Sequence, residues 1–330
     1  MFLLFLLVAQ LGAICLGETE IYAEIFYVNL NRSNDRRLSM EQNFNSLNLS
    51  YQRIEAVDAK FMTSDLNKAS TSSANKEEMK ALVFPANFLQ YKSIQLNHVF
   101  ISSGNTLKQI ACTLSHLVAI ITALQSPSKA PYALIMEDDM HLAFDIDFKK
   151  FGAIFPRDFG IIQMTTSNPL RFETLLQEYL RSGVLYKSRK ESDLWSTGGY
   201  LVNKAVLREQ MKGVLAAQDP ESDVFQMDLI AGTDRQGCAP ASCCVNGTFI
   251  HQFPCVLSDH GVQADEYLYH IAHGGTFVTT IPLFHVNETN EESTVGDSTI
   301  ELFKKAAHRI NEIVKNESLP HPSYIVKSFV

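Results

Sequence analysis

The chain has 330 residues, enough for one large α/β domain or two smaller ones, and its 46% hydrophobic content is sufficient for a buried core. The formal net charge is −8, from 28 basic and 36 acidic residues. This acidic balance excludes nucleic acid as the expected partner, because such proteins need a basic face, but it leaves room for a small basic pocket that binds a diphosphate.

The chain begins with a short apolar run, MFLLFLLVAQLGAICL, followed by Gly17. The run is too short to span a bilayer comfortably and is typical of a signal peptide cleaved near Cys15 to Gly17. No Lys or Arg precedes it, so a buried first strand or helix is the alternative. We expect a signal peptide at 1–17, no further transmembrane segment, and residence in the secretory-pathway lumen (ER or Golgi) or secretion.

Five Asn-x-Ser/Thr sequons support a secreted glycoprotein: Asn31, Asn48, Asn246, Asn287 and Asn316. The first of them lies in a region assigned to function below, so we do not expect a glycan at that position.

The first predicted elements alternate between strand and helix. Residues 21–30 (IYAEIFYVNL) are rich in β-branched and aromatic side chains and predict a buried strand. A polar turn with three arginines follows at 31–37 (NRSNDRR), then a helix at about 37–47 and a second strand at 51–57 that ends at Asp58. Within the less regular residues 60–105, the polar run 68–80 predicts an exposed loop or short helix.

The clearest helix is predicted at residues 106–125, where apolar residues recur at steps of three and four. After Pro127 to Pro131, the apolar run 132–136 (YALIM) is typical of a strand buried on both faces. A strand, a helix and a strand in this order indicate an α/β fold with a parallel sheet.

The remaining segments extend the same pattern without a repeat or a linker, so we expect one domain at 18–330. Strands are predicted at 159–165, 194–202 and 276–283. Helices are predicted at 203–212, 222–230 (a short helix or a turn), 265–272 and 300–315.

A cysteine-rich insertion interrupts the pattern at residues 238–255. Five cysteines follow the apolar start: Cys112, Cys238, Cys243, Cys244 and Cys255. Two local disulfides and one buried free thiol, Cys112, fit an oxidising lumen, and the last four cysteines allow three pairings. A zinc site is the alternative, although the insertion lacks two paired C-x₂-C units.

Three consecutive carboxylates follow the apolar strand: Glu137, Asp138 and Asp139. Packed together, they repel one another and raise at least one pKa unless a cation compensates. Divalent ions with oxygen ligands provide that compensation, and ligands of open α/β sheets bind beyond the carboxyl ends of strands. We therefore expect a divalent metal here, Mn²⁺ in preference to Mg²⁺; a solvated acidic loop is the alternative.

Four stretches together resemble glycosyltransferase family 25, which includes lipooligosaccharide and procollagen galactosyltransferases. They are FYVNLNRSNDRR (26–37), YQRIEAVDA (51–59), IACTLSHLVAI (110–120) and ALIMEDDM (133–140), and STGGYLVNKA (196–205) adds a later match. The resemblance implies a GT-A fold, a single Rossmann-like nucleotide-sugar-binding domain with a mainly parallel sheet flanked by helices. It also implies an inverting transfer of a hexose, galactose or glucose, from a UDP-sugar to a hydroxyl of a glycan or glycoprotein acceptor.

The resemblance also suggests which residues meet the nucleotide-sugar. They are Asn29, Arg32, Arg37, Asp58, Ser115, His116, Asp138, Gly198 and Gly199. Asn29 and either arginine suit uracil, ribose or phosphate, and Asp58 suits a sugar or ribose hydroxyl. The alternatives are a turn with solvated charges for the arginines, a buried core histidine for His116, and a tight turn for the two glycines.

An inverting transfer needs a general base for the acceptor hydroxyl. Asp265, in ADEYLY, is our first choice because an acid, a helix and a strand ending in proline follow one another in the family; Glu266 and Asp223 are the reserves. The alternative for such acids is a helix cap. Glu137, Asp139 and His285 are the predicted metal ligands, although a lone histidine is more often structural.

Two other classes of function compete with the transferase. A catalytically inactive secreted protein on the same fold would bind the sugar or nucleotide without turnover, because fold does not secure activity. A disulfide-rich secreted ligand fits less well, since only one short stretch is dense in cysteine.

Overall fold

The structure is a computed structural model. It describes residues 22–60, 80–82, 90–91, 94–101, 107–142, 144–189, 194, 196–212, 215, 218–219, 224–231, 244–245, 248–249, 255–258, 264–272, 275–281, 283–286, 308 and 326–329. The predicted signal peptide at 1–17 and nearly all of the predicted closing helix at 300–315 lie outside these residues.

A seven-stranded sheet forms the centre of the molecule, in the order β10-β17-β9-β11-β6-β1-β2. Its strands are β1 (Ala23–Asn29), β2 (Tyr51–Glu55), β6 (Tyr132–Glu137), β9 (Ile161–Gln163), β10 (Tyr186–Ser188), β11 (Gly199–Asn203) and β17 (Thr276–Thr279). Five strands run in one direction, whereas β11 and β10 run against them. The sheet is therefore mainly parallel, with one antiparallel strand inserted between β6 and β9.

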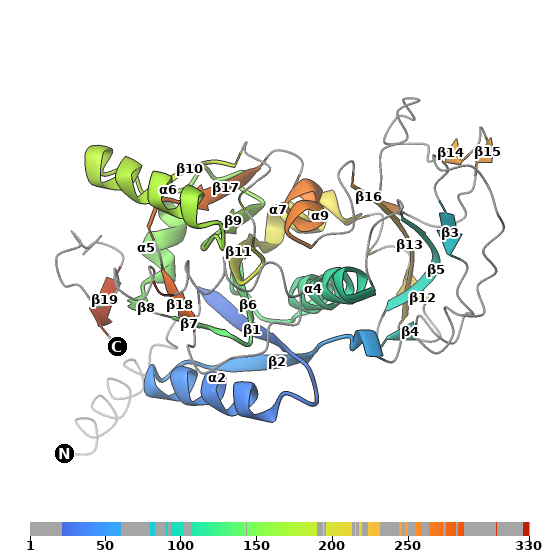
Figure 1. The fold of residues 1–330 in the computed structure, drawn as a ribbon, viewed down its shortest axis with the longest axis horizontal. Coiled ribbons are helices and arrows are strands. Elements are labelled where there is room, and N and C mark those ends of the chain that lie inside the picture. The colour runs from blue at the N-terminus through green and yellow to red at the C-terminus, as the bar shows by residue number, and fades with distance from the viewer. Residues whose placement is uncertain are drawn as a thin grey trace, which may run out of the picture.

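Helices cover both faces of this sheet (Figure 1). They are α2 (Asn34–Ser46), α4 (Leu107–Gln125), α5 (Phe148–Ala153), α6 (Pro169–Ser182), α7 (Lys204–Gln210) and α9 (Ala264–Ile271). On one face of the sheet, a buried cluster joins α4, α7 and α9 to strand residues such as Phe26 and Ile135. On the other face, a second cluster joins α2, α5 and α6 to the next residues along the same strands, such as Tyr27 and Leu134. The predicted α/β class with flanking helices is confirmed.

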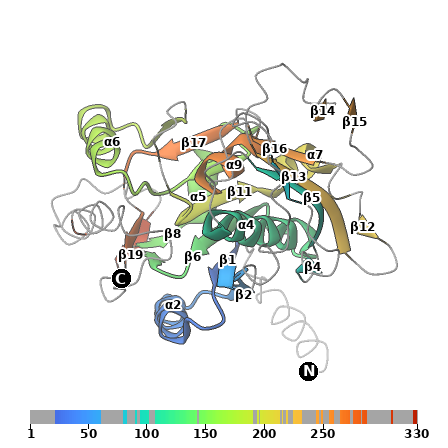
Figure 2. The same cartoon turned by 45° about the vertical axis from the view of Figure 1, so that its right-hand side comes forward.

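A second sheet has the strand order β12-β13-β5-β3, with β16 and β4 also paired to it. It lies beyond one end of α4 in both views (Figures 1 and 2). Its strands are β3 (Lys80–Leu82), β4 (Gln90–Tyr91), β5 (Ile94–Ile101), β12 (Gln218–Asp219), β13 (Val224–Ala231) and β16 (Cys255–Ser258). The short helix or turn predicted at 222–230 is therefore wrong: its β-branched and aromatic residues pair with β5 instead.

Three short strand pairs complete the described structure. They are β7 (Met140–Leu142) with β18 (Phe284–Val286), β8 (Phe144–Ile146) with β19 (Val326–Phe329), and β14 (Cys244–Val245) with β15 (Thr248–Phe249). The last pair falls in the predicted cysteine-rich insertion, whose cysteine side chains lie outside the description. Within the described parts of the chain, none of the helices has the length and apolar character needed to span a bilayer.

Gly152 allows α5 to approach the ring of Tyr132 on β6. A Cβ at Gly152 would lie 2.2 Å from Cε2 of Tyr132, and that ring also packs against Phe159 with centroids 5.5 Å apart. We expect Gly152→Ala to destabilise the protein by about 1–3 kcal/mol, because overpacking outweighs the gain of about 1 kcal/mol in helix propensity. Thermal unfolding measures this loss, and a variant as stable as the wild type would contradict it.

Candidate active site

The candidate site lies at the carboxyl ends of three parallel strands, β2, β1 and β6. Helix α2 follows β1 on one face of the sheet and α4 precedes β6 on the other, so the strand order reverses between β1 and β6. Open α/β sheets bind ligands at such a reversal. A pocket of about 290 Å³ opens here. Its lining includes Arg32, Arg36, Val57, Asp58, Lys60, Lys108, Cys112, Ser115, His116, Glu137 and Asp138.

Arg36 joins two of the three carboxylates. Its Nη1 donates to Oδ1 of Asp138 and its Nη2 donates to Oδ2 of Asp139, each at 2.8 Å. The Arg36 side chain is only 14% exposed, so its charge is held close to the end of β6. Burial lowers the pKa of Arg36, but the charges of the carboxylates outweigh that effect and raise it above its ordinary value.

Asn29, at the end of β1, ties the turn after β1 to the end of β6. Its buried Nδ2 donates to Oδ2 of Asp138 at 2.6 Å and to the carbonyl of Ser33 at 3.0 Å. Its Oδ1 accepts from Nε of Arg53 on β2 at 2.9 Å. One amide therefore connects β1 to β2 and to the end of β6, and a side chain with both a donor and an acceptor is needed there.

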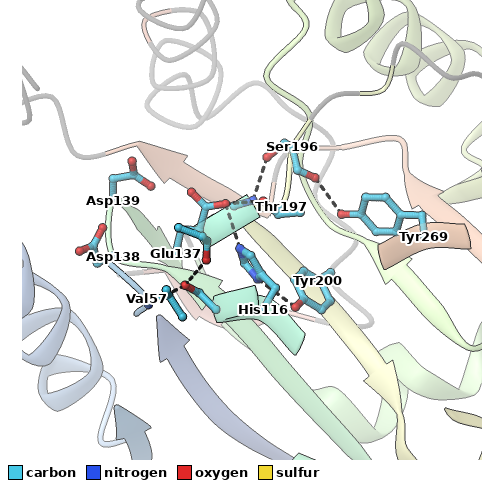
Figure 3. Close-up of polar contacts among 12 residues, drawn as sticks. Val57, His116, Glu137, Asp138, Asp139, Ser196, Thr197, Tyr200 and Tyr269 are labelled. Atoms are coloured by element: carbon cyan, nitrogen blue, oxygen red, sulfur yellow. Dashed lines mark hydrogen bonds and ion pairs between the residues drawn. The ribbon is translucent and has the colours of Figure 1, made fainter. Parts of the chain in front are cut away.

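Glu137 faces the opposite side of the strand end from Asp138 and Asp139 (Figure 3). Its Oε1 lies 3.3 Å from Nε2 of His116 and accepts from Oγ1 of Thr197 at 2.5 Å. Burial opposes ionisation of Glu137, and these partners outweigh it, so its pKa lies below the ordinary value.

His116 lies fully buried on α4, between Glu137 and Tyr200 of β11. Its Nδ1 lies 3.0 Å from the hydroxyl of Tyr200. Burial keeps the pKa of Tyr200 well above its ordinary value, so its hydroxyl stays protonated. The Glu137 carboxylate can only accept, so the contact with it places a proton on Nε2; in the neutral ring, Nδ1 then accepts from Tyr200.

Ser115, next to His116, connects α4 to the segment after β2. Its hydroxyl donates to the carbonyl of Ala111 at 2.6 Å and accepts from the backbone N–H of Val57 at 2.8 Å. This contact holds the chain just before Asp58 against the helix. Ser115 therefore shapes the wall of the pocket through the backbone.

Asp58 lies at the pocket mouth with two partners. Its carboxylate accepts from Nε of Arg32 at 2.8 Å and from the backbone N–H of Lys60 at 2.9 Å. Burial raises the pKa of Asp58, but these donors outweigh it and hold the pKa below its ordinary value. The predicted pair Arg32 and Asp58 is thus brought together with two lysines, Lys60 and Lys108, around the pocket.

The segment before β11 passes close to Glu137. Ser196 has a φ of 140°, a strained value for a residue other than glycine. Its Oγ accepts from the N–H of Gly198 and its carbonyl accepts from the Tyr269 hydroxyl. A Cβ at Gly198 would lie 2.9 Å from Met140, and one at Gly199 would lie 2.9 Å from the ring of Phe284. Side chains of the protein therefore occupy the space beside both glycines.

The predicted general base, Asp265, is not one of the residues that line the pocket. Asp265 is half-buried in the first turn of α9, which packs against α4. Burial, then the charge of Glu137 and after it the charge of Asp265 raise the pKa of the Cys112 thiol. The backbone of His285 pairs with His141 between β18 and β7. The side chains of Glu266 and His285, and the whole of Asp223, lie outside the described residues.

The pKa of Asp139 is shifted far from its ordinary value. Burial, followed by the charge of Glu137, raises its pKa to about 7, although Arg36 opposes the rise. The folded chain therefore binds this proton more tightly than the unfolded chain, and the stability that it contributes is lost as pH rises from about 4 to about 7.

We expect metal-free wild type to lose stability relative to Asp139→Asn over this pH interval. The melting temperatures of the two proteins are measured in EDTA at a series of pH values. Titration of the groups that both proteins contain affects both equally, so the difference between them reports Asp139. A difference in melting temperature that stays constant with pH would contradict the assignment.

Sequence analysis missed four residues of this site: Arg36, Arg53, Thr197 and Tyr200. It chose Arg32 and Arg37 from the same turn, whereas α2 begins at Asn34 and its first turn directs Arg36 to the end of β6. The sequence-based prediction began this helix at about residue 37, three residues late, and so counted Arg36 with the turn. Thr197 and Tyr200 are brought in by the antiparallel strand β11.

Comparison with known proteins adds a family. Residues 22–217 match the model of glycosyltransferase family 25, described as an LPS biosynthesis protein. No sequence among the curated proteins matches significantly. Similar solved structures include a mutant Drosophila β1,4-galactosyltransferase 7 in complex with manganese, UDP-Gal and xylobiose (TM-score 0.25, 9% identity, 58% of this chain and 52% of that chain). They also include mouse xyloside xylosyltransferase 1 in its apo form (TM-score 0.24, 15% identity, 56% of each chain).

This chain spans about half the length of each of these two proteins. The family match covers more than half of the chain, including every strand end that forms the pocket. The chain therefore belongs to glycosyltransferase family 25.

Proposed function

We propose that this glycosyltransferase moves a hexose, galactose or glucose, from a UDP-sugar to a hydroxyl of a glycan or glycoprotein, with inversion and with a divalent ion. The observation that carries the proposal is the pocket at the ends of β1, β2 and β6. It combines the cationic side chains of Arg32, Lys60 and Lys108 with carboxylates at one edge. A site with both cationic and anionic side chains suits a diphosphate together with a metal ion better than it suits one of these ligands alone.

The donor set fits a hard divalent ion. Asp138 and Asp139 offer carboxylate oxygens, and the guanidinium of Arg36 already occupies the position of a cation between them. We propose that these two residues hold the ion. Of the other ligands predicted from the sequence, Glu137 faces away from this pair (Figure 3), and His285 stays a prediction. When bound, the ion would neutralise negative charge on the leaving diphosphate. Mn²⁺ is the expected metal, with Mg²⁺ second.

The residues of the chain supply binding and proton transfer. Arg32, Lys60 and Lys108 would attract the diphosphate, and Asp58 would accept from a ribose or sugar hydroxyl. Asn29 fixes the Asp138 carboxylate, and Ser115 fixes the pocket wall. Asp265 remains the proposed general base, taking the proton of the acceptor hydroxyl as it attacks the sugar. The reaction is proposed to take place in the secretory-pathway lumen or after secretion.

The test is release and binding of UDP by the purified full chain. UDP-galactose and UDP-glucose are supplied in turn with Mn²⁺ or with EDTA, and the anomeric configuration of the product reports inversion. Metal-dependent release of UDP supports the transferase, and the preferred sugar identifies the donor. Tight metal-dependent binding without release on any acceptor would favour an inactive binding protein, and no binding would overturn both.

A further inference from the structure

Cys112, His116 and Glu137 form a second group of potential metal ligands, apart from Asp138 and Asp139. One ligand atom from each lies within 4.8 Å of the other two, and among the described residues no other three such side chains lie so close. Cys112 and His116 are four residues apart on α4, so they share one helix face. The 3.3 Å between Nε2 of His116 and Oε1 of Glu137 is close to the donor spacing of about 3.3–3.7 Å around a tetrahedral zinc ion.

Two of the three groups are oriented by a further partner, as metal ligands usually are. Tyr200 meets Nδ1, the nitrogen of His116 that points away from the cluster, at 3.0 Å. Thr197 holds Oε1 of Glu137 at 2.5 Å. An ion on Nε2 requires the ring proton on Nδ1, where the Tyr200 oxygen can accept it. The same contact therefore serves both the free and the metal-bound histidine.

The group is accessible from solvent through the pocket. Cys112, His116 and Glu137 all contribute to its lining, while Tyr200 and Thr197 lie buried behind them. Three protein ligands on one wall leave a fourth position toward the pocket. This is the arrangement of an open zinc site, in which water or an anion completes the tetrahedron, and it differs from a closed structural site.

We propose that Cys112, His116 and Glu137 bind a borderline-soft divalent ion of the zinc class. A thiolate, an imidazole and a carboxylate favour Zn²⁺ or Co²⁺, whereas the oxygen-only pair Asp138 and Asp139 favours Mn²⁺ or Mg²⁺. Binding displaces the thiol proton of Cys112 into solvent. The proposal goes beyond the transfer reaction and does not depend on it, although Glu137 belongs also to the ligand set predicted for the hard ion.

Cobalt spectroscopy tests this site, because Co²⁺ replaces Zn²⁺ and reports its ligands. The EDTA-treated, desalted full chain is titrated with Co²⁺. We expect a near-ultraviolet thiolate-to-cobalt charge-transfer band that saturates at one ion per chain and disappears when Zn²⁺ is added. Cys112→Ser should abolish the band, His116→Gln should weaken or shift it, and Asp139→Asn should retain it.

Two results would overturn the proposal: no thiolate band in the wild type, or a band that Cys112→Ser retains, because the other cysteines would then hold the ion. If Cys112→Ser fails to fold by circular dichroism, a band unchanged in His116→Gln overturns it. Mn²⁺-dependent UDP release is measured on the same wild-type protein. Release without a cobalt band overturns only the zinc-class site, and a cobalt band without release overturns only the transferase.

Discussion

Replacing Asp139 by asparagine should lower metal-dependent release of UDP on the order of 10²- to 10³-fold, the usual effect of removing one charge-stabilising group. The substitution keeps the shape and one oxygen of the side chain but removes its charge. In the folded chain this carboxylate is one of two that face Arg36. Without it the proposed ion loses a ligand, and the guanidinium is left with Asp138 alone.

Asp158→Asn is the matched control for this experiment. Asp158 is an exposed residue in the turn between α5 and β9, so the same change in charge there should leave UDP release unaltered. Rates are compared with Mn²⁺ in excess and with EDTA. An Asp139→Asn enzyme as active as the Asp158→Asn enzyme would remove Asp139 from the metal centre.

Replacing Lys204 by methionine should cost about 3 kcal/mol of folding free energy, because it leaves a largely buried carboxylate without its partner. Lys204 begins α7 and is 1% exposed. Its Nζ lies 2.5 Å from Oε2 of Glu24 on β1 and donates to the carbonyl of Ser128 at 3.2 Å. Urea denaturation measures the loss.

Two further variants separate the buried charge from packing. The double variant Glu24→Gln with Lys204→Met should recover much of the stability, because no unpaired charge remains inside. Lys212→Met, two residues past the end of α7, should cost less than about 1 kcal/mol, since Lys212 and its partner Glu209 are both exposed. Equal losses for Lys204→Met and Lys212→Met would contradict this account.

The elements of the main sheet could be predicted where local pattern and tertiary burial agree. The apolar run before Glu137 and the apolar face of α4 define β6 and its preceding helix almost to the residue. The same reasoning failed at 222–230, where the partner of β13 is β5, more than 120 residues earlier. Periodicity in a short run cannot reveal so distant a partner.

The candidate site, too, could be predicted from the sequence only in part. Three carboxylates after a strand could be located from the sequence, because the end of a buried strand fixes where they lie. Their orientations could not, since Glu137 contacts His116 of α4 and Thr197, which just precedes the antiparallel strand β11. The antiparallel insertion depends on the whole sheet and leaves no local signal in the sequence.

The position of β1 in the sheet has a consequence for synthesis of the chain. β1 pairs with β2 on one edge and with β6 on the other. β2 follows shortly, but β6 starts only at Tyr132. At about 5–20 residues per second, ribosomes need roughly 5–20 s to reach it. Throughout that interval, one edge of the apolar segment AEIFYVN has no strand to pair with, and unpaired edges recruit other chains. Nascent chains that do not yet contain β6 should therefore depend on chaperones to protect this edge of β1.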